Sequence, residues 1–154
     1  QLPQEEAWAL LTQGTYGVLS VVGDEGWPYA VPMHYTVMDG QIYLHCAKTG
    51  YKLDAIARDD RVCFTVTLRE ELVQDHATSL YESVVVLGRA ALVTDQATHQ
   101  AALAHLVDAL GRVSPDLRDQ YIARRGQNTA VLVIRPVHLT GKAKRDFRPI
   151  QQRM

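Results

Sequence analysis

Strand-like apolar runs separated by short turns constrain the fold of this chain more than any other feature. The runs cover residues 16–22, 29–38, 41–46, 61–73, 79–94 and 128–137. Asp39-Gly40 joins the second run to the third and favours a tight hairpin, because both residues tolerate a positive φ. No Gly-x-Gly-x-x-Gly joins a strand to a helix, which argues against a dinucleotide-binding Rossmann fold. The pattern predicts a mainly β protein, a six-stranded, mostly antiparallel Greek-key barrel with peripheral helices.

Short helical patterns lie between and around these runs. In residues 4–13, Ala7, Leu10 and Leu11 form an apolar stripe, which predicts an amphipathic helix. Further helices are expected over residues 53–57, over residues 97–110, and from Pro115 onward. A basic tail is expected to run from residue 142 to residue 153.

One strand is too apolar for a sheet with one solvated face. Residues 84–87 read Val-Val-Val-Leu, without the alternation of apolar and polar side chains that such a strand shows. We therefore expect this segment to lie in the barrel interior or beneath a partner subunit.

Size and charge narrow the class of protein. At 154 residues and 17.2 kDa the chain has the usual size of one domain, expected to cover residues 1–154. A net charge of −1 gives no field that would recruit nucleic acid or an anionic membrane. No apolar run approaches the ~20 residues of a spanning helix, and the acidic start is unlike a signal peptide. A cytoplasmic protein is expected.

The two cysteines do not form a metal or redox motif. Cys46 and Cys63 lie in separate strand-like runs, with no Cys-x-x-Cys pair. His34, His45 and Cys46 share no ligand spacing typical of zinc, so no metal site is expected.

The turn after the third strand has the composition of a phosphate site. Lys48 and Lys52 flank Gly50, and a short helix opens directly behind them. N–H groups at a helix N-terminus and lysine ammonium groups both attract phosphate. An ordinary strand-to-helix connection with solvated lysines remains the alternative.

Several sequence runs occur in a familiar order. They are residues 14–21 (GTYGVLSV), 26–33 (GWPYAVPM), 40–47 (GQIYLHCA), 81–90 (YESVVVLGRA) and 139–142 (LTGK). This succession resembles the FMN-binding split-barrel proteins related to pyridoxamine 5'-phosphate oxidase, and is most similar to the nitroimidazole-resistance (Nim) flavoproteins. The resemblance implies a split barrel, and a homodimer that binds the flavin at its subunit interface.

The resemblance also implies which residues meet the flavin. The ring would rest along Tyr29, Ala30, Val31, Pro32 and Met33, beside His45, Cys46 and Ala47. The phosphate would lie at Lys48, Thr49, Gly50 and Lys52, and Ser83 and Lys142 would reach the flavin, Ser83 from either subunit. From the residues alone, 29–33 also fits an edge strand protected by its prolines, and His45 also fits a structural histidine.

The function implied is the reduction of a small nitroaromatic compound by bound FMN, with FAD as a possible replacement and His45 as the catalytic residue. A passive flavin-binding protein is one alternative, and a haem-binding barrel with His138 as axial ligand is another. The chain end lacks the arginine- and tryptophan-rich segment of pyridoxamine phosphate oxidases, which argues against that oxidation. His76, His99, His105 and His138 otherwise fit solvated surface positions.

Overall fold

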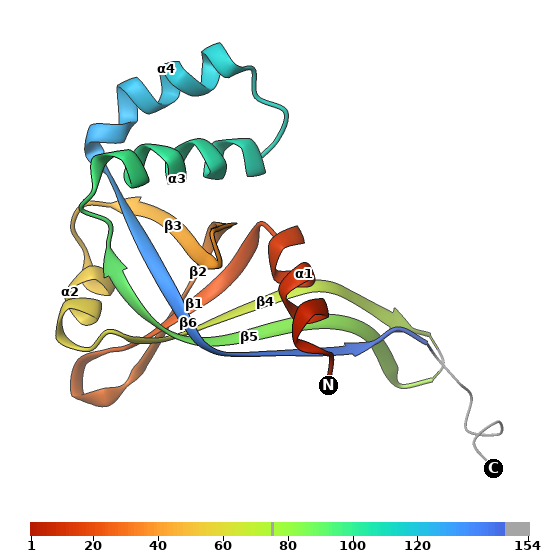
Figure 1. The fold of residues 1–154 in the computed structure, drawn as a ribbon. Coiled ribbons are helices and arrows are strands. Elements are labelled where there is room, and N and C mark those ends of the chain that lie inside the picture. The colour runs from red at the N-terminus through yellow and green to blue at the C-terminus, as the bar shows by residue number, and fades with distance from the viewer. Residues whose placement is uncertain (75, 147–154) are drawn as a thin grey trace.

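The strand-like runs of the sequence close into a ring. The computed structural model describes residues 1–74 and 76–146, and within them six antiparallel strands form a closed barrel in the order β1-β2-β3-β6-β5-β4 (Figure 1). The strands are β1 (Tyr16–Val22), β2 (Pro28–Met38), β3 (Gln41–Ala47), β4 (Arg61–Val73), β5 (Thr78–Leu92) and β6 (Thr129–Lys144). The pairing of β1 with β4 completes the ring and confirms the predicted fold class.

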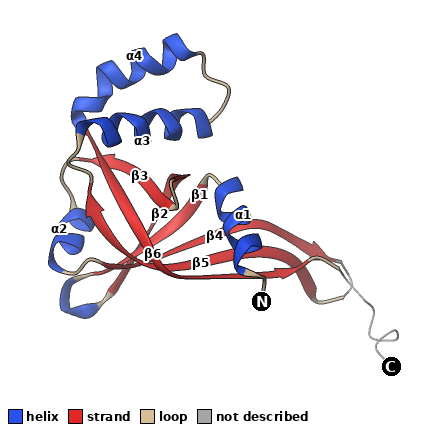
Figure 2. Cartoon of the chain, viewed as in Figure 1, coloured by secondary structure: helices blue, strands red, loops and turns tan. Residues whose placement is uncertain are grey.

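Helices lie outside this barrel (Figure 2). They are α1 (Gln4–Gln13), α2 (Tyr51–Arg58), α3 (Gln96–Ala109) and α4 (Pro115–Arg125), with single 3-10 turns η1 (Asp24–Gly26) and η2 (Gly126–Asn128). α3 packs through Ala102 and Leu103 onto Tyr43, Val131 and Val133, and so covers the outer side of β3 and β6. No helix in the described part of the chain is long and apolar enough to cross a membrane.

The apolar run in β5 divides between the two sides of the barrel wall. Val84 and Val86 are fully buried in the core, as expected for an interior strand. Val85 and Leu87 point outward and remain 36% and 48% exposed, because successive side chains of a strand face opposite sides. The interior prediction is therefore right for two of the four residues.

The last strand extends beyond its predicted end. β6 continues from residue 137 to Lys144, so that Lys142 belongs to a strand rather than to a tail. Its register with β5 shifts between Leu87 and Gly88, which gives Val137 no direct partner and places Pro136 at an irregular position of the ladder. Leu139 and Gly141 then return to the buried side, and the strand continues. Residues 147–153 of the predicted tail lie outside the described residues.

A buried tyrosine ties α1 to the barrel. The Tyr35 hydroxyl donates a hydrogen bond of 2.5 Å to the Leu11 carbonyl, and the Tyr35 ring packs edge-on against Phe64 at 5.0 Å. Leu11 lies in the last turn of α1, where carbonyl groups have no partner within the helix. Burial raises the pKa of Tyr35, so this hydroxyl keeps the proton that it donates.

Tyr35→Phe should therefore lower the free energy of unfolding by about 1–3 kcal/mol, because it leaves the Leu11 carbonyl buried without a partner. Urea denaturation followed by circular dichroism measures this loss. The matched control is Tyr43→Phe, whose hydroxyl meets only the Gln41 side chain at 3.2 Å. Equal losses for the two variants would contradict the role given to Tyr35.

Candidate functional site

β2, β3 and the start of β6 form one wall of an open cavity of about 470 Å³. We call it the β2–β3 cavity. Its lining includes seven residues that the sequence assigned to a flavin site, namely Val31, Pro32, Met33, His45, Cys46, Ala47 and Lys52. Residues 31–33 and 45–47 lie just beyond the Tyr35–Leu44 pair at which the β2–β3 ladder ends, and there they pair with β1 and β6. Six of the predicted ring residues and one predicted phosphate residue, Lys52, thus meet at one place.

The remaining lining residues are not among the predicted flavin contacts. Tyr16 and His34 belong to β1 and β2, while Tyr121, Arg125, Asn128 and Thr129 lie at the end of α4, in η2 and at the start of β6. Tyr121 and Arg125 are four residues apart and share one helix face. That spacing was readable in the sequence, but the return of α4 to the barrel was not.

The charge of the β2–β3 cavity is suited to an anion. Lys52 and Arg125 contribute cations, and none of its lining residues is an aspartate or glutamate. The lysine stands in the first turn of α2, where the helix dipole adds partial positive charge. A ligand with a phosphate and a flat uncharged part fits this combination of cations and apolar strand residues.

The two histidines of the cavity influence one another. Burial lowers the pKa of His45, and the nearby His34 lowers it further. The His34 ring stacks at a tilt on Tyr16, with 4.9 Å between ring centres, and its Nδ1 lies 3.2 Å from the Thr15 carbonyl. A carbonyl oxygen only accepts, so this contact makes Nδ1 of His34 the donor. His45 is accordingly a mostly neutral group at pH 7.

The buried surroundings of Cys46 make its thiol unreactive. Burial raises its pKa, and the opposing influence of Lys52 is smaller. The thiol therefore stays protonated near neutral pH, and Cys46 lines the cavity as a small apolar group.

The loop before α2 holds the other predicted phosphate residues. Gly50 adopts a φ of 140°, a conformation that favours glycine, and its carbonyl accepts hydrogen bonds from the N–H groups of Leu53 and Asp54. Thr49 is exposed beside it. Tyr29 lies next to this loop, since its ring meets the edge of Tyr51 at 4.9 Å. Thr49, Gly50, Tyr29 and the exposed Ala30 do not line the cavity itself.

Two predicted residues lie elsewhere. Ser83 and Lys142 are direct partners in the ladder between β5 and β6. They share the outward side of the wall with Val85 and Leu87, and neither lines the β2–β3 cavity. One chain therefore does not bring these two residues to the other predicted contacts.

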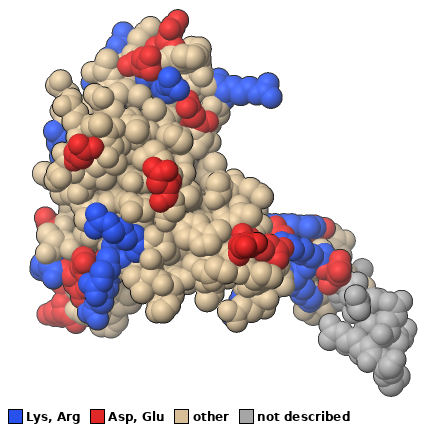
Figure 3. All heavy atoms as spheres, viewed as in Figure 1, with Lys and Arg blue, Asp and Glu red and all other residues tan. Residues whose placement is uncertain are grey.

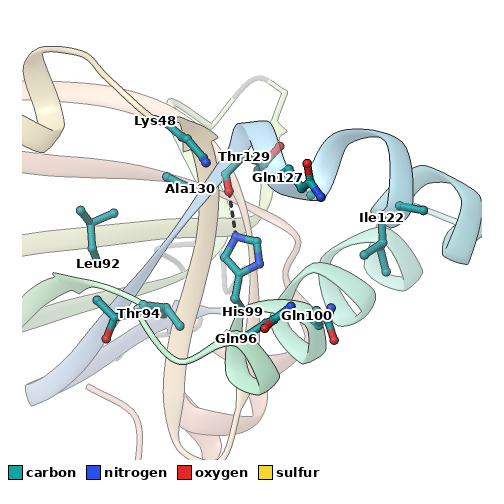
Figure 4. A pocket seen from close by; sticks show the side chains of 13 residues that line it. Lys48, Leu92, Thr94, Gln96, His99, Gln100, Ile122, Gln127, Thr129 and Ala130 are labelled. Carbon is teal, nitrogen blue, oxygen red and sulfur yellow. Dashed lines mark hydrogen bonds between the residues drawn. The ribbon is translucent and has the colours of Figure 1, made fainter.

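A second cavity adjoins the first. It has a volume of about 550 Å³, and both cavities are lined by Thr129 (Figure 4). Lys48 reaches this second cavity rather than the first. His99, expected to be solvated, is half-buried in its wall, with Nε2 at 2.8 Å from the Thr129 carbonyl. His76, His105 and His138 are exposed, and neither cavity is lined by them.

Comparison with known proteins identifies relatives across most of the chain. Residues 3–143 match the family model described as pyridoxamine 5'-phosphate oxidase. No curated protein gives a significant match.

Three solved structures illustrate the similarity of fold. A proposed 5-nitroimidazole antibiotic resistance protein from Bacteroides thetaiotaomicron is 23% identical, with a TM-score of 0.78 over 93% of this chain and 85% of that chain. The flavocytochrome Anf3 from Azotobacter vinelandii is 22% identical, with a TM-score of 0.77, and the match covers 98% of this chain and 72% of that chain. An FAD-binding protein from Mesorhizobium loti is 22% identical, with a TM-score of 0.68, and the match covers 93% of this chain and 96% of that chain. The shared fold is the split barrel.

Proposed function

The chain belongs to the pyridoxamine 5'-phosphate oxidase family, and we propose that it binds a flavin, with the FMN group in the β2–β3 cavity. The observation that carries this proposal is the meeting of seven predicted flavin contacts around one cation-lined cavity. A bound flavin would supply the redox chemistry, and the protein would bind and orient it and its substrate.

The phosphate of the FMN group is assigned to Lys52 and the start of α2. The N-terminal end of a helix carries a partial positive charge, which attracts a phosphate. Lys52 adds a full charge in the first turn of α2, at the edge of the cavity. The φ of 140° at Gly50, which residues with a side chain rarely adopt, allows the chain to turn into the helix at this point.

The flavin ring is assigned to the wall formed by Val31, Pro32 and Met33. These residues offer an apolar surface, and Pro32 has no N–H group that would need a partner there. His45 faces the same cavity and can hold a hydrogen bond to a polar edge of the ring or to a substrate oxygen. The residues present therefore fit a flat, anionic cofactor.

We assign the homodimer interface to the outward face of β1, β4 and β5. Two rows of paired residues run across these three strands into β6, and neither row contains an acidic residue, a lysine or an arginine. One row is Val18, Thr65, Val85 and Thr140, and the other is Ser20, Cys63, Leu87 and His138. The ion pairs Asp59–Arg61 and Asp60–Arg89 border this face at one end, and Ser83 and Lys142 lie at the other. A centre depleted of charged residues, with charged residues at its rim, is typical of a protein interface.

Elsewhere the surface carries its charges in groups. In Figure 3, charged side chains gather over the α3–α4 helices and toward the ends of the barrel, with few over the wall between them. A partner subunit seated on the outward face would bring its own Ser83 and Lys142 along, and these residues would then complete the flavin site from the second chain.

We further propose that the loaded protein reduces nitroaromatic compounds such as nitroimidazoles. The support is the likeness to the Bacteroides protein and the apolar wall on which a flat substrate would stack. In this scheme His45 orients the nitro group and donates a proton to its oxygen. The proton donor is the imidazolium form, and because the pKa of His45 is lowered, this form becomes abundant only at a more acidic pH than for an ordinary histidine.

Lys52→Glu should weaken FMN binding by about 10–150-fold or more, since it removes a charged hydrogen bond and adds repulsion. Riboflavin, which has no phosphate, should bind almost as before. Fluorescence titration with both flavins measures the difference, and Arg112→Glu, an exposed site outside both cavities, is the charge-matched control. Equal weakening of FMN and riboflavin would mean that Lys52 acts through folding.

Leu87→Glu should convert the dimer to a monomer, because it places a charge at the centre of the outward face. FMN binding should weaken with it, although Leu87 lies outside the cavity. Analytical ultracentrifugation gives the mass, and FMN at a hundredfold its Kd should stabilise the wild type by about 2.7 kcal/mol. Leu117→Glu on α4, at a leucine 57% exposed, is the control. A wild type that is monomeric would overturn the interface.

His45→Ala should slow the reoxidation of the chemically reduced, FMN-loaded protein by a nitroimidazole, by up to 10²–10⁴-fold if proton donation is fully lost. Its FMN affinity should stay nearly unchanged, and the wild-type rate should rise as the pH drops. Anaerobic stopped flow measures the rates, with His105→Ala on the exposed side of α3 as control. If the wild type is no faster than free reduced FMN, the protein is a passive flavin binder.

A further inference from the structure

The second cavity, whose lining Figure 4 shows, has no assigned ligand. It lies between α3, the turn from α4 into η2, and the facing ends of β5 and β6. Its volume of about 550 Å³ is within the ~300–1,000 Å³ of cavities that bind small molecules. It is larger than the β2–β3 cavity beside it.

Three of the polar side chains that line this second cavity are carboxamides. Gln96 and Gln100 come from α3, and Gln127 comes from η2 on the other side (Figure 4). Each carboxamide offers a donor and an acceptor side by side, the pattern that pairs with the N6 and N7 edge of adenine. None of the residues lining the cavity is an aspartate or glutamate.

His99 adds a fixed acceptor to this set. Its Nε2 lies 2.8 Å from the Thr129 carbonyl, which only accepts, so Nε2 carries the proton. In the neutral ring Nδ1 is then an acceptor, held in place by the contact with β6. Apolar walls complete the cavity, with Ile122 on one side and Leu92, 50% exposed, on the other.

The position of the cavity links it to the proposed phosphate site. Thr129 lines both cavities, and Lys48 lines the second one immediately after Ala47, which lines the first. The only cation in its lining is thus in the loop that leads to Lys52. A group attached to a phosphate held at Lys52 would enter the second cavity past Lys48.

We infer that the second cavity binds an adenosine phosphate group. The group is either the nucleotide half of FAD, whose FMN half lies in the β2–β3 cavity, or the adenosine end of a separate dinucleotide such as NADPH. The first source rests on the proposed flavin site, whereas binding of an adenine nucleotide by itself does not.

The test compares FAD, FMN, NADPH and AMP as probes of the full chain. Ala123→Phe places a ring into the second cavity from an exposed position on α4, and Gln100→Leu removes one carboxamide without adding bulk. Ala101→Phe, an exposed alanine of α3 outside this cavity, is the matched control. Calorimetry and fluorescence titration give the affinities.

If FAD is the source, the wild type should bind FAD at least tenfold more tightly than FMN. Ala123→Phe should abolish that preference, Gln100→Leu should reduce it, and both should leave FMN affinity unchanged. If a separate dinucleotide is the source, NADPH and AMP should compete for one site on the FMN-loaded protein, and Ala123→Phe should weaken both at least tenfold.

Two further results separate the two proposals. FMN binding without a preference for FAD and without binding of AMP or NADPH would overturn the adenosine site and leave the flavin site standing. AMP binding that is sensitive to Ala123→Phe, in a protein that binds no flavin, would support the adenosine site and overturn the proposed function.

Discussion

Side chains fill the interior of the six-stranded barrel, and this filling confines every binding site to its outside. Leu19, Leu44, Phe64, Val86 and Leu132 are all fully buried and converge from five strands on the same core. A small barrel packed in this way holds no ligand within it. Both cavities are accordingly formed on the outer side, where helices and loops add walls to the strand ends.

The placement of α3 on the barrel determines the shape of both cavities. Ala102 and Leu103 fix this helix to Tyr43, Val131 and Val133, which form an apolar patch on the outside of β3 and β6. α4 packs back on α3, and the chain then enters β6 through η2 (Figure 1). Arg125 and Gln127 reach different cavities from this one short connection, so the packing of α3 positions the walls of both.

Local signals made most of the fold predictable. The Asp39-Gly40 turn has positive φ at both residues, as the hairpin prediction required, and the predicted helix over 4–13 has the observed bounds. The predicted end of the last strand at residue 137 was wrong, because β6 continues to Lys144 beyond the irregular pairing at Pro136. Whether a proline ends a strand or lies in a bulge depends on its partner Gly88, nearly fifty residues away. Pairing over such distances leaves no local pattern.

The residues of the candidate site also differ in how far local sequence patterns indicate their position. Residues 31–33, 45–47 and 52, which the family resemblance implies as flavin contacts, line the β2–β3 cavity. Tyr121, Arg125 and His99 line the two cavities through the packing of two helices, which no local pattern predicts. Ser83 and Lys142 lie on the outward wall, at the border of the proposed interface. A single chain cannot give them the role implied by the family resemblance, but a second copy seated on that wall can. In the proposed dimer, binding of the flavin and association of the two chains would form one coupled equilibrium, in which each stabilises the other.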